Sequence, residues 1–205
     1  MTAPSAPSIA DAASSLTDPA YLKAKFEAGL GYDAYLDTAT DDQQAGWRKI
    51  GEKVQLTDAQ KQLLGGFVRD IHVLAVSGAW CGDCVRQGPM IQAIAQASSG
   101  RIKVAWFDRD EHPDLQRQVS VNGGHRVPVA IFAAEDFQQV GWFGDKGLAR
   151  YRVMAQQALG ANCPLPGAPV PQNEIDAEVA DWVDQFERIH LILRLSARLR
   201  KKHND

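Results

Sequence analysis

Apolar positions in the middle of the chain alternate between a pattern typical of buried strands and one typical of amphipathic helices. Residues 71–76 read Ile-His-Val-Leu-Ala-Val and are almost continuously apolar, as expected of a strand covered on both faces. Beyond them, apolar residues recur at helical spacing up to Gly100. The expected strands are 71–76, 102–108, 127–132 and 139–143, and helices are expected at 58–69, between the first two strands, at 113–119 and at 146–159.

The order β-α-β-α-β-β-α predicts the α/β class and a layered sandwich. Because a helix joins the first two strands through a right-handed crossover, these strands should be parallel.

Further segments lie on both sides of this central pattern. Early aromatic residues such as Tyr35 and Trp47 form stripes that are expected to pack on a core. After a run of prolines, Asn173 can cap a long amphipathic helix. The expected units are a flexible arm at 1–16, a helical N-terminal extension at 17–55, a central domain at 56–160, a Pro-rich connector at 161–172 and a C-terminal amphipathic helix at 173–203 packed on the core.

Composition narrows the possible functions. A chain of 205 residues, 45% hydrophobic, is long enough for one core with additions. The net charge of -3 gives no field that attracts phosphate backbones, so a nucleic-acid partner is not expected. No apolar run approaches the ~20 residues that span a bilayer, so no membrane association is expected. The opening residues lack the features of a secretory signal, which predicts a cytoplasmic protein.

The candidate chemistry lies at Cys81-Gly82-Asp83-Cys84, where the first strand ends and a helix begins. At a helix N-terminus, unpaired N–H groups and the helix dipole favour a thiolate, so Cys81 is the expected nucleophile. The spacing brings Cys84 close enough to form a disulfide with it. Cys84 can therefore attack a mixed disulfide at Cys81 and release the substrate.

Trp80-Cys81-Gly82-Asp83-Cys84, followed by Arg126-Val127-Pro128, resembles the thioredoxin family over about residues 56–159. The resemblance implies a three-layer α/β/α sandwich with a mixed central sheet, to which the terminal helices are additions. It implies that Cys81 is the exposed nucleophile and Cys84 the buried resolving thiol. Trp80 matches the aromatic residue beside the nucleophile, and Pro128 the cis-proline opposite the disulfide. The backbone of Val127 would pair with an extended substrate segment.

Two positions depart from the family's pattern. Thioredoxins usually have a buried Asp six residues before the first Cys, where this chain has Ala75, and a Lys on the next strand, where it has Trp106. The proton of the resolving thiol therefore needs another acceptor. The titratable candidates nearby in the sequence are Asp83, Asp108, Asp110 and His125.

The position of Asp83 predicts the direction in which it shifts the pKa of the thiols. A carboxylate near both sulfurs destabilises the thiolate, raises the thiol pKa and disfavours the reduced form relative to the disulfide. This predicts a pair on the reducing side. Arg126 would oppose Asp83 if it faces the disulfide.

Other interpretations of the cysteines remain open. A structural zinc site needs four ligands, and no second C-x-x-C or H-x-x-H pair is present, so neither a metal nor a cofactor is expected. Cys163 is either an unpaired thiol or a third redox cysteine that takes the disulfide from Cys84. The favoured function is a thiol-disulfide oxidoreductase that reduces a disulfide-containing protein, or a small-molecule disulfide, and is regenerated by an unidentified reductant. The alternative is a non-enzymatic redox sensor or docking module, because the apolar stripe from Ile175 to Leu199 would be a partner surface if exposed.

Overall fold

The structure, a computed structural model, describes residues 16–159 and 173–205 and is built on a mixed four-stranded sheet. The strand order is β2-β1-β3-β4. The first pair is parallel, as predicted, and the other two pairs are antiparallel. The strands are β1 (Ile71–Ser77), β2 (Ile102–Asp108), β3 (Val129–Ala133) and β4 (Gln139–Gly144).

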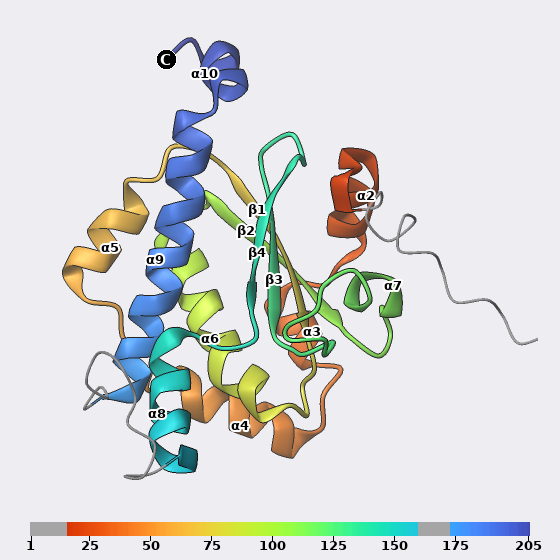
Figure 1. The fold of residues 1–205 in the computed structure, drawn as a ribbon, viewed down its shortest axis with the longest axis vertical. Helices are drawn as coiled ribbons and strands as arrows, with labels where there is room; N and C mark the ends of the chain where they lie inside the picture. Colours follow the sequence, from red (N-terminus) through yellow and green to blue (C-terminus); the bar gives the residue numbers. More distant parts are fainter. Residues whose placement is uncertain (1–15, 160–172) are drawn as a thin grey trace, which may run out of the picture.

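Helices cover both faces of the sheet, so the predicted α/β sandwich with additional helices is confirmed. Figure 1 shows α6 (Gly82–Ala97) and α9 (Glu174–Leu195) on one side of the strands and α2 (Pro19–Ala28) and α7 (Pro113–Gln116) on the other. The remaining helices are α3 (Tyr32–Leu36), α4 (Asp41–Gly51), α5 (Asp58–Gly65), α8 (Leu148–Leu159) and α10 (Ala197–His203).

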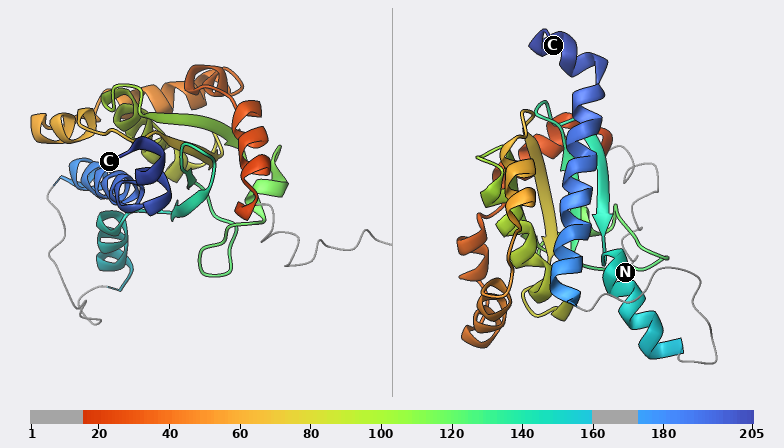
Figure 2. Two further views of the ribbon diagram at one scale, coloured as in Figure 1. Left: turned by 90° about the horizontal axis from the view of Figure 1, so that it is seen from above. Right: turned by 90° about the vertical axis from the view of Figure 1, so that its left-hand side faces the viewer.

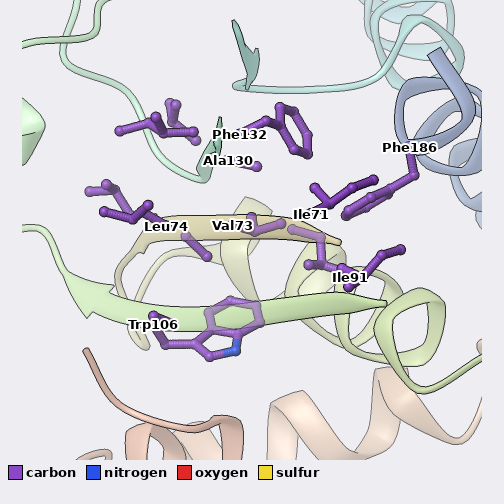
Figure 3. Close-up of a cluster of buried hydrophobic side chains, with 14 of the residues drawn as sticks. Ile71, Val73, Leu74, Ile91, Trp106, Ala130, Phe132 and Phe186 are labelled. Carbon is purple, nitrogen blue, oxygen red and sulfur yellow. The ribbon is translucent and has the colours of Figure 1, made fainter. Parts of the chain in front are cut away.

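The core surrounds β1, in which all seven residues are buried. Figure 3 shows Ile71, Val73 and Leu74 of this strand together with labelled side chains from β3, α6 and α9. The rings of Phe132 and Phe186 meet edge to face at 5.4 Å. A strand buried on both faces needs this continuous apolar sequence, which is the signal that predicted it.

The segment between α2 and α3 pairs with β2, an edge strand of the sheet. Leu30 exchanges two backbone hydrogen bonds with Trp106 of β2, at 3.1 and 2.8 Å, which protects an otherwise unpaired strand edge. Tyr35 stacks on Trp106, and Trp47 meets both rings edge to face. All three side chains are at most 1% exposed, so the prediction that the early aromatic stripes pack on a core is confirmed for Tyr35 and Trp47.

Trp47 also contacts the segment that carries the cysteines. Its indole Nε1 donates a hydrogen bond of 3.1 Å to the carbonyl oxygen of Ala79. Its ring lies against Gly88 of α6, where a Cβ atom would overlap it. Close packing of α4 on α6 therefore requires glycine at position 88.

The C-terminal helix α9 lies alongside the sheet (Figure 2), and most side chains of its apolar stripe are buried in the core. Its Trp182 donates from Nε1 to Gln87 Oε1 of α6 at 3.0 Å, and Gln87 Nε2 donates to the Asp145 carbonyl at 2.7 Å. The buried members of the stripe are Val179, Trp182, Val183, Phe186, Ile189 and Leu193.

The prediction of one helix over 173–203 is wrong at Ser196. There the backbone is extended, with φ -68° and ψ 114°, and the Ser196 side chain accepts from the Leu199 N–H to cap a new helix, α10. Serine at this position competes for helical N–H groups, which favours a helix start over continuation. The expected helix at 58–69 similarly ends early, at Gly65, because Gly66 follows as its C-cap.

Neither α9 nor any other helix in residues 16–159 and 173–205 combines the length and apolar character that crossing a membrane requires. The predicted arm at 1–16, except Leu16, and the predicted connector at 161–172 lie outside the described residues.

Gly88→Ala tests the close approach of α4 to α6. The added methyl group would overlap the Trp47 ring, so the variant should lose about 1–3 kcal/mol of unfolding free energy through overpacking. Denaturant unfolding measures this loss. Gly46→Ala is the matched control, because its methyl would lie at an ordinary 3.5 Å from Val85 and alanine favours helix by up to about 1 kcal/mol. Equal stability of the Gly88→Ala variant and the parent chain would contradict this packing.

Candidate functional site

The two cysteines stand at the junction of β1 and α6, as the sequence predicts. Cys81 is the N-cap residue of α6, with an extended backbone at φ -83° and ψ 122°, and Cys84 lies in the first turn. Both thiols are free. The Cys81 side chain is half-buried, whereas Cys84 is fully buried. One thiol is thus partly accessible to solvent and the other is shielded from it.

The surroundings of the two sulfurs drive their pKa values apart. A hydrogen bond from the Cys84 thiol, with further bonds from the backbone N–H groups of Cys84 and Asp83, lowers the pKa of Cys81 to about 6. These N–H groups are free to bind a thiolate because they lie in the first turn of a helix. Burial, and the hydrogen bond with Cys81, raise the pKa of Cys84. Near neutral pH, Cys81 is therefore a thiolate and Cys84 a thiol.

The predicted substrate-facing residues lie beside Cys81. Its Sγ is 3.7 Å from the carbonyl oxygen of Val127, and the Val127–Pro128 peptide bond is cis. Trp80 is 49% exposed, and the guanidinium group of Arg109 lies 4.8 Å above its ring. The Val127 carbonyl thus lies beside the half-buried sulfur, and Trp80, one residue before Cys81, presents a partly exposed ring.

The partner of Asp83 is a residue that the sequence did not indicate. Lys146 Nζ lies 2.8 Å from Asp83 Oδ2 and 2.9 Å from Asp145 Oδ2. Arg126 was a candidate partner of Asp83, but it pairs with Asp145 instead, at 3.4 Å. The Asp83 carboxylate does raise the pKa of Cys81, as expected, but the hydrogen bonds to the sulfur outweigh it.

Asp145 fixes the position of Lys146. It is 1% exposed and accepts hydrogen bonds from Tyr151 Oη at 2.5 Å and from Lys146. Burial works against ionisation, but these two donors hold the pKa of Asp145 below its usual range. The carboxylate is therefore ionised, and Lys146 is shared between two anions.

The expected acid behind Cys84 is replaced by apolar groups. Ala75 and Trp106 are direct partners in the β1–β2 ladder and are each 1% exposed. Of the candidate proton acceptors, Asp110 pairs with Arg109 at 3.1 Å, and His125 bonds the Val119 carbonyl.

The hydroxyl groups of Ser77 and Tyr35 are both buried, and neither has a hydrogen-bond partner among the described residues.

Within residues 16–159 and 173–205, no three His, Cys, Asp or Glu side chains gather in an arrangement that could hold a metal ion. Cys163 lies outside the described residues.

Comparisons with known proteins place the chain in a family. A family model described as Thioredoxin matches residues 29–155, and the match begins before residue 56, where the central domain was predicted to start. Thioredoxin from Thiocapsa roseopersicina is 41% identical over 44 residues, which are 22% of this chain and 48% of the relative. Thioredoxin 1 from a Nostoc species is 32% identical over 74 residues, 31% of this chain and 69% of the relative. The chain thus spans about half the length of the first relative and about two thirds of the second.

Solved structures of similar fold cover most of the chain. A protein of unknown function from Pseudomonas aeruginosa superposes with a TM-score of 0.64 at 18% identity, covering 83% of this chain and 95% of the other. An HIV epitope scaffold gives 0.57 at 17% identity, covering 85% and 98%. These likenesses show the fold, and the family model covers more than half of the sequence. The chain therefore belongs to the thioredoxin family.

Proposed function

We propose that the protein is a thiol-disulfide oxidoreductase that reduces protein or small-molecule disulfides through Cys81 and Cys84. The observation that carries this proposal is the split between the two thiols. Cys81, half-buried at a helix N-terminus, has a pKa of about 6, while its fully buried neighbour keeps its proton. A reductase of this type needs such an exposed thiolate beside a protected second thiol.

The reaction proceeds in two exchanges. The Cys81 thiolate attacks one sulfur of the substrate disulfide, forming a mixed disulfide and expelling the other sulfur as a thiolate. Cys84 then loses its proton and attacks the Cys81 sulfur, which releases the second substrate thiolate. The substrate gains two electrons, and the protein is left with a Cys81–Cys84 disulfide that a cellular reductant must reduce.

Substrate binding is assigned to the groups that flank Cys81. An extended peptide can pair with the backbone at Val127, next to Pro128, and rest a side chain on the exposed face of Trp80. Arg126 binds Asp145 beside this edge. A disulfide-containing protein is therefore the proposed partner.

The redox tuning is assigned to Asp83 and Lys146. The carboxylate raises the pKa of Cys81 and so favours the disulfide form, while the ammonium group 2.8 Å away weakens that effect. Asp83 is proposed to shift the pair toward the reducing side, to an extent limited by Lys146 and by the hydrogen bonds that lower the pKa of Cys81 to about 6.

The docking-module alternative loses its main support. It depended on an exposed apolar stripe between Ile175 and Leu199, but most of that stripe is buried against the core. Leu191, Ile192 and Leu195 are the exposed apolar side chains of α9 among the described residues.

Cys81→Ser and Cys84→Ser should separate the two exchanges. Cys81→Ser should abolish insulin reduction by a dithiol such as dithiothreitol above the uncatalysed rate, because no nucleophile remains. Cys84→Ser should instead accumulate a covalent substrate adduct at Cys81, visible as a mass increase that excess dithiol removes. Full reduction activity in Cys81→Ser would contradict the proposed function.

Asp83→Asn and Lys146→Gln should shift the reactivity of Cys81 in opposite directions. The parent alkylation rate with iodoacetamide should rise as pH increases through about 6, where the thiolate forms. Removing the Asp83 carboxylate should move this midpoint to lower pH and raise the reduction potential, because the reduced form is stabilised. Removing the Lys146 charge should do the reverse.

Lys103→Gln serves as the control for these charge changes. Lys103 pairs with Asp70 at 2.8 Å on an exposed part of β2, so its loss should leave the midpoint unchanged. A midpoint that moves in the same direction in Asp83→Asn and Lys146→Gln would refute the assigned coupling.

A further inference from the structure

A surface pocket of about 520 Å³ lies next to the cysteines and includes the side chain of Trp80 in its lining. Trp80 directly precedes Cys81 in the chain, and it is 49% exposed. Because consecutive Cα atoms are only about 3.8 Å apart, a group bound against Trp80 lies close to the disulfide that Cys81 attacks. The pocket is therefore placed to contact the residues that flank a substrate cysteine.

One part of the pocket is apolar and comes from the N-terminal extension. Leu30 lines the pocket with a side chain that is 40% exposed, and Tyr35 of α3 lies beside it in the lining. Both are fixed to β2, since Leu30 exchanges backbone hydrogen bonds with Trp106 and Tyr35 stacks on the ring of the same residue. The methylene groups of a long side chain can lie on such a surface while its polar end reaches further.

Another part of the pocket is acidic. The side chains of Asp108, Asp110 and Glu111 line it at the point where β2 ends. Asp110 pairs with Arg109 at 3.1 Å, and the same guanidinium group lies over Trp80. Within residues 16–159 and 173–205, neither Asp108 nor Glu111 has an ion-pair partner. Two acidic groups at one pocket are thus left without a counter-charge, which favours a ligand that supplies a cation.

The lining also contains a buried hydroxyl group without a partner. Tyr35 is 1% exposed, and its hydroxyl has no hydrogen bond to any described residue. Buried polar groups normally have partners, so this unused capacity calls for an explanation. A hydroxyl oxygen can accept a hydrogen bond, and the charged ends of Lys and Arg are donors only. The unpaired carboxylates and the unpaired hydroxyl therefore suit the same kind of ligand.

We propose that this pocket binds a basic side chain of the substrate, so that the protein prefers disulfides in which a Lys or Arg lies near the attacked cysteine. The inference rests on the proposed function, because it specifies which disulfides Cys81 reduces. The aliphatic part of the basic side chain lies on Leu30 and Trp80. Its charged end binds the carboxylates of Asp108 and Glu111.

A basic side chain suits the pocket better than an acidic or an apolar one. An acidic side chain would add a third negative charge to the two that are unpaired. An apolar side chain would cover Asp108 and Glu111 without pairing them, and the removal of a charged group from water without a partner is costly. The preference should be moderate, because Glu111 is exposed and Asp108 only partly buried, and ion pairs near solvent are weak.

Matched peptides measure this preference. Each peptide has one cysteine, joined through a disulfide to the coloured thiol nitrothiobenzoate. In one series a single Lys occupies successive positions on either side of the cysteine among neutral residues, and in the other Gln replaces the Lys. The Cys81 thiolate of the reduced full chain attacks the peptide sulfur, forms a mixed disulfide and expels the coloured thiolate. Its absorbance gives the second-order rate, from which the rate of Cys81→Ser is subtracted as the background of other thiols.

At the position that reaches the pocket, the Lys peptide should react roughly three- to ten-fold faster than the Gln peptide at low salt. Added salt should reduce this ratio by screening the charges. Asp108→Asn combined with Glu111→Gln should bring the ratio close to one. The ratio is the readout because a variant that folds poorly slows both peptides together.

Asp58→Asn combined with Glu52→Gln is the matched control. It removes one Asp and one Glu charge at exposed positions, the first residue of α5 and the C-cap of α4, and neither residue lines the pocket. This variant should keep the parent ratio, because the preference depends on the pocket and not on the total charge of the protein.

Three results would overturn the proposal. The ratio could be close to one at every position in the parent chain, although coloured thiol is released. A ratio above one could persist in Asp108→Asn with Glu111→Gln, or fall equally in the control, which would assign the preference to charges elsewhere. Neither peptide series could release coloured thiol, which would remove the proposed function itself and differs from the first result because no peptide reacts.

Discussion

The geometry of the two cysteines depends on how the first turns of α6 are held, and two buried indole groups from opposite ends of the chain hold them. Trp47 donates to the carbonyl of Ala79, just before the cysteines, and its ring fits against Gly88. Trp182 donates to Gln87 one residue earlier on the same helix. Buried polar groups need partners, and these donors satisfy groups that the central domain alone would leave unpaired. The terminal helices are thus part of what positions the dithiol.

The packing of α9 on α6 also affects the charged groups around Cys81. Gln87 accepts a hydrogen bond from Trp182 and donates one to the Asp145 carbonyl, and the Asp145 carboxylate binds Lys146. Lys146 in turn neutralises part of the Asp83 charge that would otherwise oppose the thiolate. These contacts therefore connect α9, through Gln87, Asp145 and Lys146, to the carboxylate next to the cysteines.

The parts of this site that the sequence predicts are those with local signals. Cys81 and Cys84 follow an apolar strand and open a helix, and Val127-Pro128 begins a second apolar run. Lys146 carries no such signal, because its role arises from its ion pair with Asp83, which is far away in the sequence. The apolar pattern does not predict the helix break at Ser196, because the apolar stripe continues past this residue. The break comes from the Ser196 side chain, which caps a new helix.

The absence of a carboxylate at position 75 is consistent with the low pKa of Cys81. A carboxylate at Ala75 would lie buried against Trp106, where an ion is costly unless it is paired. It would also place a second negative charge near the Cys81 thiolate, in addition to Asp83, and so raise the pKa that the backbone N–H groups lower. With apolar groups there, Trp106 can form the aromatic cluster with Tyr35 and Trp47.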